Sequence, residues 1–315
     1  MRNWIYIICL FSCTNQLQAQ IYPRDTSFTI AATLQKELKK FPFISVATEK
    51  LAANIVCYPN LTYATTQHRS LTADIFAPTL RSEYPAVVLI HGGGWRSGDK
   101  TQMHTMATTL AKNGFVGICV EYRLSPEAAF PAGVRDIKRC IRWVKSRAKE
   151  FRIDTSKMTV LGCSSGGQMA ALIATTNFDP FFDDRLLLGM PSSHIQAAID
   201  IDGILAFKHP LSAEGAVAAQ WLGGTYEEKP ANWVLASPLT HVNQHTAPTL
   251  FINSDMPRFH AGRDEYMDTL HRYHIPTEAI TLNGTPHTFW FFHPWYNDVM
   301  QYVMRFLRNT FQLKN

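Results

Sequence analysis

The sequence has few charged residues and no long apolar run, and both absences narrow what it can be. Charged residues make up 17% of its 315 positions and apolar residues 46%, against about 25% charged in typical soluble proteins. This composition excludes a disordered chain. No segment after the first twenty residues has the ~20 consecutive apolar residues that a membrane-spanning helix needs, so we expect no stable membrane insertion.

Positive charge is not concentrated anywhere. The formal net charge of +5 is spread along the whole sequence, and no run of Lys and Arg exceeds a few residues. Proteins that bind nucleic acids usually gather these residues on one face or in one stretch. We therefore predict no nucleic acid partner.

Cysteine is also scarce, with six residues and no Cys-x-x-Cys or zinc-like spacing. This excludes a small disulfide-stapled fold, and we predict neither a metal site nor an organic cofactor. Cys119 and Cys140 fall in apolar strand-like and helix-like patterns, which favours small core residues. The sequence does not settle whether disulfides join any of the four cysteines beyond the first twenty residues: Cys57, Cys119, Cys140 and Cys163.

The first twenty residues have a composition of their own. A single arginine precedes an apolar run that ends at Phe11, which is too short to span a bilayer, and Ala19 offers a small residue for cleavage. This pattern predicts a signal peptide over residues 1–19 and a periplasmic or secreted protein. The alternatives are a lipoprotein signal with Cys13 as the lipidated residue, and a buried first helix.

Strand-like and helix-like patterns alternate from about residue 84 onward. Residues 86–90 form a continuous apolar run, as in a strand buried on both faces. Such alternation predicts an α/β protein whose mostly parallel central sheet carries helices on both faces. We expect strands at 86–90, 115–121, 157–162, around 199–201, 249–253 and 277–282, and helices at 103–113, 131–151, 166–176, 261–273 and 295–311.

Two regions do not follow this alternation of strands and helices. Residues 53–77 resemble an antiparallel start to the sheet, and residues 178–245 add loops and short helices that we expect to form an insertion over the site. There is no internal repeat or low-complexity linker. We therefore expect residues 20–315 to form a single catalytic domain.

The strongest chemical motif is Gly-Cys-Ser-Ser-Gly at 162–166, between a predicted strand and a predicted helix. Glycines on both sides permit the tight, strained turn that presents a nucleophilic hydroxyl, here that of Ser164. The backbone N–H of Ser165 would then help to bind an oxyanion. The alternative is an ordinary glycine-rich turn.

A second motif, His-Gly-Gly-Gly-Trp at 91–95, directly follows the first buried strand. A loop of this kind supplies the other half of the oxyanion hole in hydrolases with such a nucleophile turn, which assigns this role to the N–H groups of Gly93 and Gly94. We expect His91 to be structural. Trp95, at the end of the loop, is a candidate substrate contact.

The remaining catalytic groups are expected near the end of the chain. His287 lies in a loop between the last predicted strand and the last helix, where an imidazole can accept the Ser164 proton. The chain order Ser–Asp–His favours Asp255, after the strand at 249–253, as the acid that orients this imidazole. Asp264 and Asp202 remain open as alternatives.

Two groups of side chains near these positions are candidates for reading the substrate. Arg258 and Arg263 lie close after Asp255, so they either bind a carboxylate-bearing substrate or only carry surface charge at a helix start. The aromatic residues after His287 favour core packing, with sugar stacking as the alternative: Trp290, Phe291, Phe292 and Trp295.

Together with the segments 121–126 and 130–136, these motifs resemble the α/β-hydrolase superfamily. Within it they resemble the esterase/lipase branch of hormone-sensitive-lipase-like enzymes, bacterial carbohydrate acetylesterases and kynurenine formamidases. The resemblance covers about residues 55–310. It implies the α/β-hydrolase fold, catalysis without a cofactor, and a structural role for Asp136 in tying a helix to the oxyanion loop.

The resemblance and the motifs predict a serine esterase with an acyl-enzyme on Ser164. We expect it to remove acetyl or other small acyl groups from carbohydrate esters, with a small molecule or a polysaccharide as substrate. The alternatives are a kynurenine-formamidase-like enzyme or a general carboxylesterase, and, outside enzymes, an inactive glycan-binding protein of the hydrolase fold. The sugar, the acyl group and the oligomeric state stay open.

Overall fold

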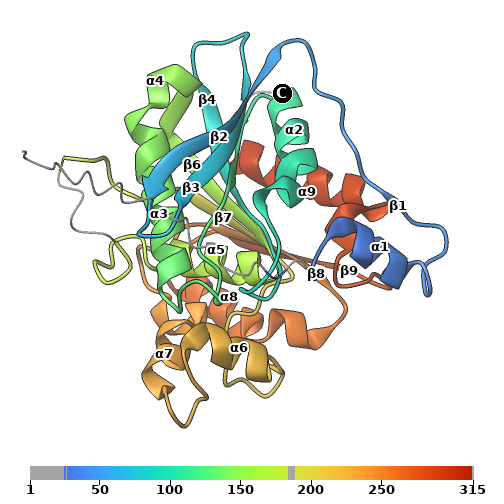
Figure 1. Cartoon of the computed structure of the whole chain (residues 1–315), viewed down its shortest axis with the longest axis vertical. Helices are drawn as coiled ribbons and strands as arrows, with labels where there is room; N and C mark the ends of the chain where they lie inside the picture. The colour runs from blue at the N-terminus through green and yellow to red at the C-terminus, as the bar shows by residue number, and fades with distance from the viewer. Residues whose placement is uncertain (1–24, 26, 184–188, 314–315) are drawn as a thin grey trace, which may run out of the picture.

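A central sheet of eight strands organises the computed structural model, which describes residues 25, 27–183 and 189–313 (Figure 1). The predicted signal peptide lies outside these residues. The strand order is β2-β3-β5-β4-β6-β7-β8-β9, and all neighbours from β5 to β9 are parallel. The strands are β2 (Ile55–Thr65), β3 (Ser70–Pro78), β4 (Tyr84–Ile90), β5 (Val116–Val120), β6 (Ile153–Cys163), β7 (Ala197–Ile201), β8 (Thr249–Ser254) and β9 (Thr277–Leu282).

The expected antiparallel start is present, because β2 and β3 form a hairpin whose second strand pairs antiparallel with β5. The central strand β4 is buried along its whole length. Its alternate side chains enter two different cores, since successive residues of a strand point to opposite faces. Val88 and Ile90 join one core, and Val87 and Leu89 join the other. The continuous apolar run therefore marks a strand covered on both sides.

Helices cover both faces of this sheet, as Figure 1 shows. On one face α3 and α5 pack into the first core, and on the other α2 and α9 pack into the second. The predicted mostly parallel α/β fold is confirmed. The helices are α2 (His104–Lys112), α3 (Ala132–Ser146), α4 (Ala148–Phe151), α5 (Ser165–Thr175), α8 (Arg263–Arg272) and α9 (Trp295–Thr310).

Some element boundaries differ from the prediction. The helix expected over 131–151 breaks at Arg147 into α3 and α4, and Arg152 then takes a left-handed conformation with φ of 57° to enter β6. The insertion holds two short helices, α6 (Gly215–Leu222) and α7 (Pro230–Leu235), followed by the 3₁₀ turn η2 (Pro238–His241). Figure 1 shows α6 and α7 below the sheet, at one end of the molecule.

Elements near the start of the described chain were not expected. Helix α1 (Ile30–Glu37) begins with Thr29, whose hydroxyl accepts a hydrogen bond from the N–H of Ala32 as an N-cap. The short strand β1 (Ser45–Val46) pairs antiparallel with β10 (Phe292–His293). This pairing ties the N-terminal segment to the loop region that follows β9.

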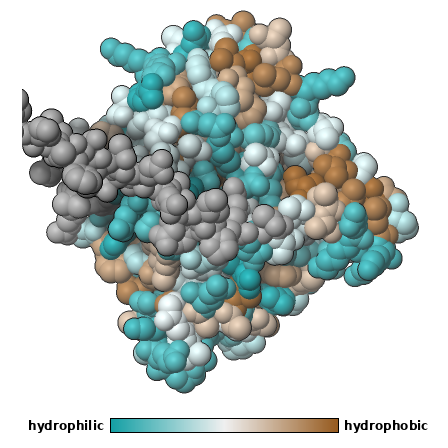
Figure 2. All heavy atoms as spheres, in the orientation of Figure 1, coloured by the Kyte–Doolittle hydropathy of each residue, from teal (hydrophilic) through white to brown (hydrophobic). Residues whose placement is uncertain are grey.

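The described residues also show the state of the cysteines and the character of the surface. All four cysteines they contain are free thiols: Cys57, Cys119, Cys140 and Cys163. Within the same residues, no helix combines the length and apolar character needed to cross a membrane. The face seen in Figure 2 is mostly hydrophilic, with hydrophobic areas that include the α1–β1 end, where Phe43 is 66% exposed.

Candidate active site

Ser164 lies at the sharp turn between β6 and α5. Its φ of 55° and ψ of −122° are unusual for a residue with a side chain. A Cβ atom on Gly162 would lie 1.9 Å from the carbonyl oxygen of Gly166, and one on Gly166 would lie 2.3 Å from that of Ile90. Only glycine fits at these two positions, so the motif is required by the turn that presents the serine hydroxyl.

His287 reaches this hydroxyl from the loop after β9. Its Nε2 lies 2.8 Å from Ser164 Oγ, and its Nδ1 lies 2.8 Å from Oδ2 of Asp202. An ionised carboxylate only accepts hydrogen bonds, so Nδ1 carries the proton that Asp202 accepts. This tautomer leaves the Nε2 lone pair directed at the serine O–H.

The partner of His287 is therefore Asp202, and the sequence-based choice of Asp255 is wrong. Asp255 is exposed and accepts a hydrogen bond from the backbone N–H of Gly284 instead. Asp264 forms a salt bridge at 2.8 Å with Arg263 on the surface. Neither carboxylate contacts the imidazole.

Asp202 is held firmly at the end of β7. It has a left-handed backbone conformation, with φ of 54°, and its side chain is fully buried. Its Oδ1 accepts the backbone N–H of Ser254 at 2.8 Å, and its Oδ2 accepts the hydroxyl of the same residue at 2.7 Å. Both oxygens are thus satisfied, as a buried carboxylate requires.

Aromatic rings fix the plane of the imidazole. Phe259 is stacked on His287 with ring centroids 3.4 Å apart, and Trp290 meets it edge-on at 5.2 Å. The guanidinium of Arg258 lies over the same Phe259 ring, 4.6 Å from its centroid. Of the aromatic residues after His287, Trp290, Phe291 and Phe292 are buried in the core, so they pack rather than offer a stacking surface to a sugar.

The glycine loop approaches the serine closely. A Cβ atom on Gly92 would lie 2.8 Å from the carbonyl oxygen of Cys163 and 3.2 Å from Ser164 Cβ. Within the part of the chain that the structure describes, the backbone N–H groups of Gly93, Gly94 and Ser165 donate to no protein acceptor. These donors remain available to an oxygen bound beside Ser164.

His91, at the start of this loop, is buried and belongs to the support of the loop. Its ring stacks on that of Tyr122, with centroids 4.5 Å apart. The Tyr122 hydroxyl donates to the His91 carbonyl oxygen at 2.8 Å. These contacts place His91 in a structural role.

Trp95 does not reach the site as a substrate contact. Its backbone is left-handed, with φ of 59°, and its side chain turns into the core, where the residue is 2% exposed. The ring stacks on Trp221 with centroids 4.9 Å apart, and its Nε1 donates to Gln168 at 2.9 Å. The prediction for Trp95 is therefore wrong, and the residue joins the loop to the insertion.

The two candidate arginines have different surroundings. Arg263 donates to Asn253 at 3.0 Å and pairs with Asp264, and its side chain is 13% exposed. Its guanidinium is engaged on the protein, which contradicts its expected contact with substrate. Arg258 is 46% exposed, pairs with Glu214 at 3.2 Å, and borders the same cleft as His287.

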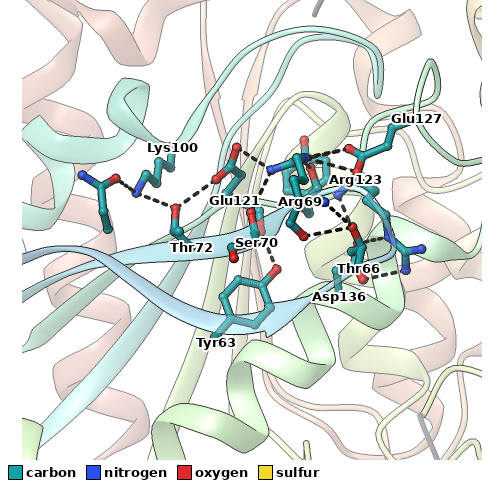
Figure 3. A network of polar contacts seen from close by, with 12 residues as sticks. Tyr63, Thr66, Arg69, Ser70, Thr72, Lys100, Glu121, Arg123, Glu127 and Asp136 are labelled. Carbon is teal, nitrogen blue, oxygen red and sulfur yellow. Dashed lines mark hydrogen bonds and ion pairs between the residues drawn. The ribbon is translucent and has the colours of Figure 1, made fainter. Parts of the chain in front are cut away.

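Ion pairs anchor the segment that supports the glycine loop. Arg123 donates to Asp136 at 2.7 Å, so Asp136 ties α3 to the segment that contains Tyr122. Arg69 pairs with Glu121 at 2.8 Å, and Figure 3 shows the same network continuing as far as Lys100. The resemblance implied this structural role for Asp136.

A cleft of about 480 Å³ opens beside His287. One of its walls is α1 with its flanking residues, and the other is the segment 256–259 with the loop 285–288. The sequence carried no motif that would place the N-terminal helix here. Its lining combines aromatic rings with basic groups: Phe28, Phe41, Phe259, Lys36, Lys40 and Arg258.

A second buried carboxylate, that of Asp200, lies near α5, the helix that follows Ser164. The sequence analysis did not select this residue. Burial raises the pKa of Asp200 well above its usual value of 3.8. Its Oδ1 accepts the N–H of Gly203 at 2.7 Å, and a Cβ atom on Gly167 would lie 2.1 Å from the same oxygen. Asp200 therefore packs against the start of α5 and does not contact Ser164 or His287.

Among the described residues, no cluster of three His, Cys, Asp or Glu side chains is placed to hold a metal ion. What the site offers is a hydroxyl, an imidazole and a carboxylate in hydrogen-bonded series, with backbone donors beside the hydroxyl. This arrangement can activate a serine for attack on a carbonyl group.

Comparison with known proteins adds sequence relatives. A family model described as BD-FAE matches residues 73–258, which include Ser164 and Asp202. The probable carboxylic ester hydrolase LipM of Mycobacterium tuberculosis is 29% identical over 174 residues, which cover 53% of this chain and 40% of LipM. Carboxylesterase NlhH of the same species is 38% identical over 98 residues, 31% of each chain. The chain thus spans less than half the length of these curated relatives.

Solved structures share the fold. A carbohydrate esterase from gut microbiota, in truncated form, has a TM-score of 0.66 and 23% identity, and the match covers 83% of this chain and 99% of that one. A bifunctional GH43-CE protein of Bacteroides eggerthii has a TM-score of 0.70 and 22% identity, covering 81% of this chain and 38% of that one. These likenesses establish the α/β-hydrolase fold of this chain.

Proposed function

This chain belongs to the BD-FAE family, and we propose that it is a carboxylic ester hydrolase that uses Ser164 as its nucleophile. The observation that carries the proposal is the series of two 2.8 Å hydrogen bonds from Ser164 through His287 to Asp202. Three groups of the required types meet there from the segments that follow β6, β7 and β9, in the arrangement by which a serine triad is recognised.

The proposed reaction begins when His287 Nε2 accepts the Ser164 proton while Oγ attacks the ester carbonyl. Asp202 stabilises the imidazolium and keeps its orientation. Negative charge on the carbonyl oxygen is then bound by the N–H groups of Gly93, Gly94 and Ser165. His287 returns the proton to the leaving alcohol, which leaves an acyl group on Ser164.

Water completes the cycle by the same steps. His287 takes a proton from water as the oxygen attacks the acyl-enzyme, and the collapse of the second tetrahedral intermediate frees Ser164 and the carboxylic acid. Every proton in the cycle passes through Nε2. These steps consume one water molecule for each ester, and Ser164, His287 and Asp202 return to their starting state.

For the substrate, we propose acetyl or other small acyl esters of carbohydrates, met in the periplasm or outside the cell. Two findings support this choice: carbohydrate esterases are among the proteins that share the fold, and the cleft beside His287 combines aromatic and polar groups. The predicted signal peptide supports the location. A general carboxylesterase is the second candidate, favoured by the sequence relatives LipM and NlhH.

Hydrolysis of p-nitrophenyl acetate tests the reaction class. We expect turnover by the wild type and its loss in Ser164→Ala, with an unchanged circular dichroism spectrum. Ser156→Ala is a matched control, because Ser156 is an exposed serine at the other end of the same strand. This variant should keep wild-type turnover.

Release of acetate from acetylated xylan, acetylated pectin and simple sugar acetates tests the substrate. We expect release from at least one of these esters. If none of them releases acetate, the carbohydrate proposal is contradicted.

A further inference from the structure

The start of the described chain contacts the residues that directly follow the glycine loop (91–95). Asp25 forms a β-bridge with Ser97, and its carboxylate pairs with Arg96 at 2.7 Å. We call Asp25, Ser27 and Phe28 the N-terminal strap. It lies directly before α1, the helix that forms a wall of the cleft beside His287.

Ser97 joins the strap to the loop through its hydroxyl. Its Oγ donates to the carbonyl oxygen of Asp25 at 2.7 Å and accepts the N–H of Phe28 at 3.0 Å. The other polar group of the Phe28 backbone, its carbonyl oxygen, accepts a hydrogen bond from Gln102 at 2.9 Å. Ser97 is 1% exposed, so water cannot replace these contacts without an opening of the loop.

The backbone of Ser97 also holds the Gly93 peptide. Its N–H donates to the Gly93 carbonyl oxygen at 3.0 Å, and the N–H of Arg96 donates to the same oxygen at 3.2 Å. A Cβ atom on Gly93 would lie 2.1 Å from the Ser97 carbonyl oxygen, so the two residues are in close backbone contact. The position of Ser97 therefore fixes the direction of the Gly93 carbonyl group.

That direction sets the direction of an oxyanion donor. A trans peptide is planar, so the N–H of Gly94 points opposite to the carbonyl group of Gly93. The N–H groups of Arg96 and Ser97 hold the Gly93 carbonyl group on the side of the strap. The Gly94 N–H therefore points away from the strap. The strap, Ser97 and the Gly94 N–H thus form one connected unit.

We propose that the N-terminal strap is a positioning element of the oxyanion hole, acting through Ser97 on the Gly93–Gly94 peptide. The inference rests on the proposed ester hydrolysis. It makes the segment just after the predicted signal peptide part of the catalytic machinery, although no residue of the strap touches the reacting atoms.

Ser97→Ala tests the proposal. Loss of a whole oxyanion donor typically lowers kcat by about 10²–10³-fold, so a loosened donor should lower it by roughly 10- to 100-fold. KM should stay within about threefold. A boronic acid, which becomes a tetrahedral anion on Ser164, should lose affinity by a factor similar to that of kcat, because it uses the same donors.

Ser237→Ala is the matched control. Ser237 is also buried, and its hydroxyl likewise accepts a backbone N–H, that of Phe207 at 3.0 Å, and donates to a carbonyl oxygen, that of Trp233 at 2.9 Å. It lies in the insertion, and none of its hydrogen bonds among the described residues involves residues 91–99. We expect it to lower Tm about as much as Ser97→Ala but to leave kcat and boronate affinity unchanged. Equal behaviour of the two variants in kcat and boronate affinity would overturn the proposal.

A double variant tests whether the strap acts as a unit. Gln102→Met frees the Phe28 carbonyl oxygen, so combined with Ser97→Ala it should lower kcat little more than Ser97→Ala alone. Independent, multiplying losses would contradict a single strap.

Hydrogen exchange of residues 91–99 provides a readout that needs no turnover. It should rise in Ser97→Ala and not in Ser237→Ala, and unchanged exchange in both would also overturn the proposal. If Ser164→Ala kept full activity, the ester hydrolysis mechanism would fail while this exchange result still decided the role of the strap.

Discussion

His287 Nδ1 lies 2.8 Å from Oδ2 of Asp202, a residue 85 positions earlier in the chain. Asp202 also lies beside Ser164, because β7 is next to β6 in the sheet and Cys163 pairs with Ile201 at the ends of these strands. The residues that follow, Ser164 and Asp202, therefore emerge side by side. The N–H of Ser164 donates to the carbonyl oxygen of Ile201 at 2.7 Å.

Asp202→Asn should lower kcat for p-nitrophenyl acetate by roughly 10⁴-fold, the loss seen when a triad histidine has the wrong partner. The amide can donate to Nδ1 and so favours the wrong tautomer. Asp255→Asn is the matched control, since this exposed carboxylate accepts the Gly284 N–H and, among the described residues, contacts neither Ser164 nor His287. A larger loss in Asp255→Asn than in Asp202→Asn would contradict the geometry.

The sequence singled out Ser164 and His287 but left Asp202 as an alternative to Asp255, and the reason is topological. The turn at Ser164 needs glycines, which are visible in the sequence at positions 162 and 166. His287 was found because the histidine comes last in the chain order Ser–Asp–His. By contrast, Asp202 and Asp255 both follow apolar strands. Choosing between them requires the order of β7 and β8 in the sheet and the hydrogen bonds from Ser254, and a sequence pattern contains neither.

Trp95 and the N-terminal strap show the same limit. The glycine loop lies close to Ser164, but the left-handed backbone of Trp95 turns its ring into the core. The contacts of Ser97 with Asp25 and Phe28 join residues about seventy positions apart. No sequence pattern predicts the left-handed conformation of Trp95 or the distant contacts of Ser97.

Arg258 remains a candidate for binding the carboxylate of an anionic sugar, because it borders the cleft beside His287 and is partly exposed. A charge-assisted contact with a carboxylate contributes about 1.5–3 kcal/mol. Arg258→Met should therefore raise KM for an acetylated galacturonide by roughly 10- to 150-fold and leave KM for an acetylated xyloside nearly unchanged.

Arg263→Met is the control for that measurement. Its guanidinium is bound to Asn253 and Asp264, so the substitution should lower Tm and affect both esters alike. Equal losses on the charged and the neutral ester in Arg258→Met would exclude carboxylate recognition by this residue.

The ring of Phe259 should contribute to catalysis by holding the imidazole plane. Its centroid lies 3.4 Å from that of His287, and aromatic pairs of this kind contribute about 0.5–1.5 kcal/mol. Phe259→Ala should lower kcat by roughly 2- to 12-fold, measured at saturating p-nitrophenyl acetate. Phe178→Ala, at an exposed phenylalanine outside the cleft lining, should have no effect, and unchanged kcat in both would show that the stack is incidental.

Asp74 should make stability depend on pH in the acid range. Burial disfavours its ionisation, but hydrogen bonds from His104, Asn60 and Lys100 outweigh burial and lower its pKa from 3.8 to about 2. A lowered carboxyl pKa stabilises the fold above the unfolded value of 3.8. This contribution, about 2 kcal/mol, is lost as the pH falls from about 3.8 through about 2.

Urea unfolding at several pH values measures this contribution. Asp74→Asn should be less stable at pH 7 and should show a flatter decline between pH 4 and pH 2 than the wild type. Asp298→Asn, at an exposed carboxylate in the first turn of α9, should leave the decline unchanged. An equally steep decline in Asp74→Asn would assign the acid sensitivity to other groups.

If His287 activates Ser164 as a nucleophile, the Ser164 hydroxyl should react covalently with a reagent for activated serines. The protein is treated with a fluorophosphonate, which phosphonylates activated serines, and the labelled residue is identified by peptide mass spectrometry. We expect one adduct, on Ser164, formed rapidly in the wild type, absent in Ser164→Ala and strongly slowed in His287→Ala. An unlabelled wild-type protein, an adduct on another residue, or an unchanged labelling rate in His287→Ala would contradict this activation.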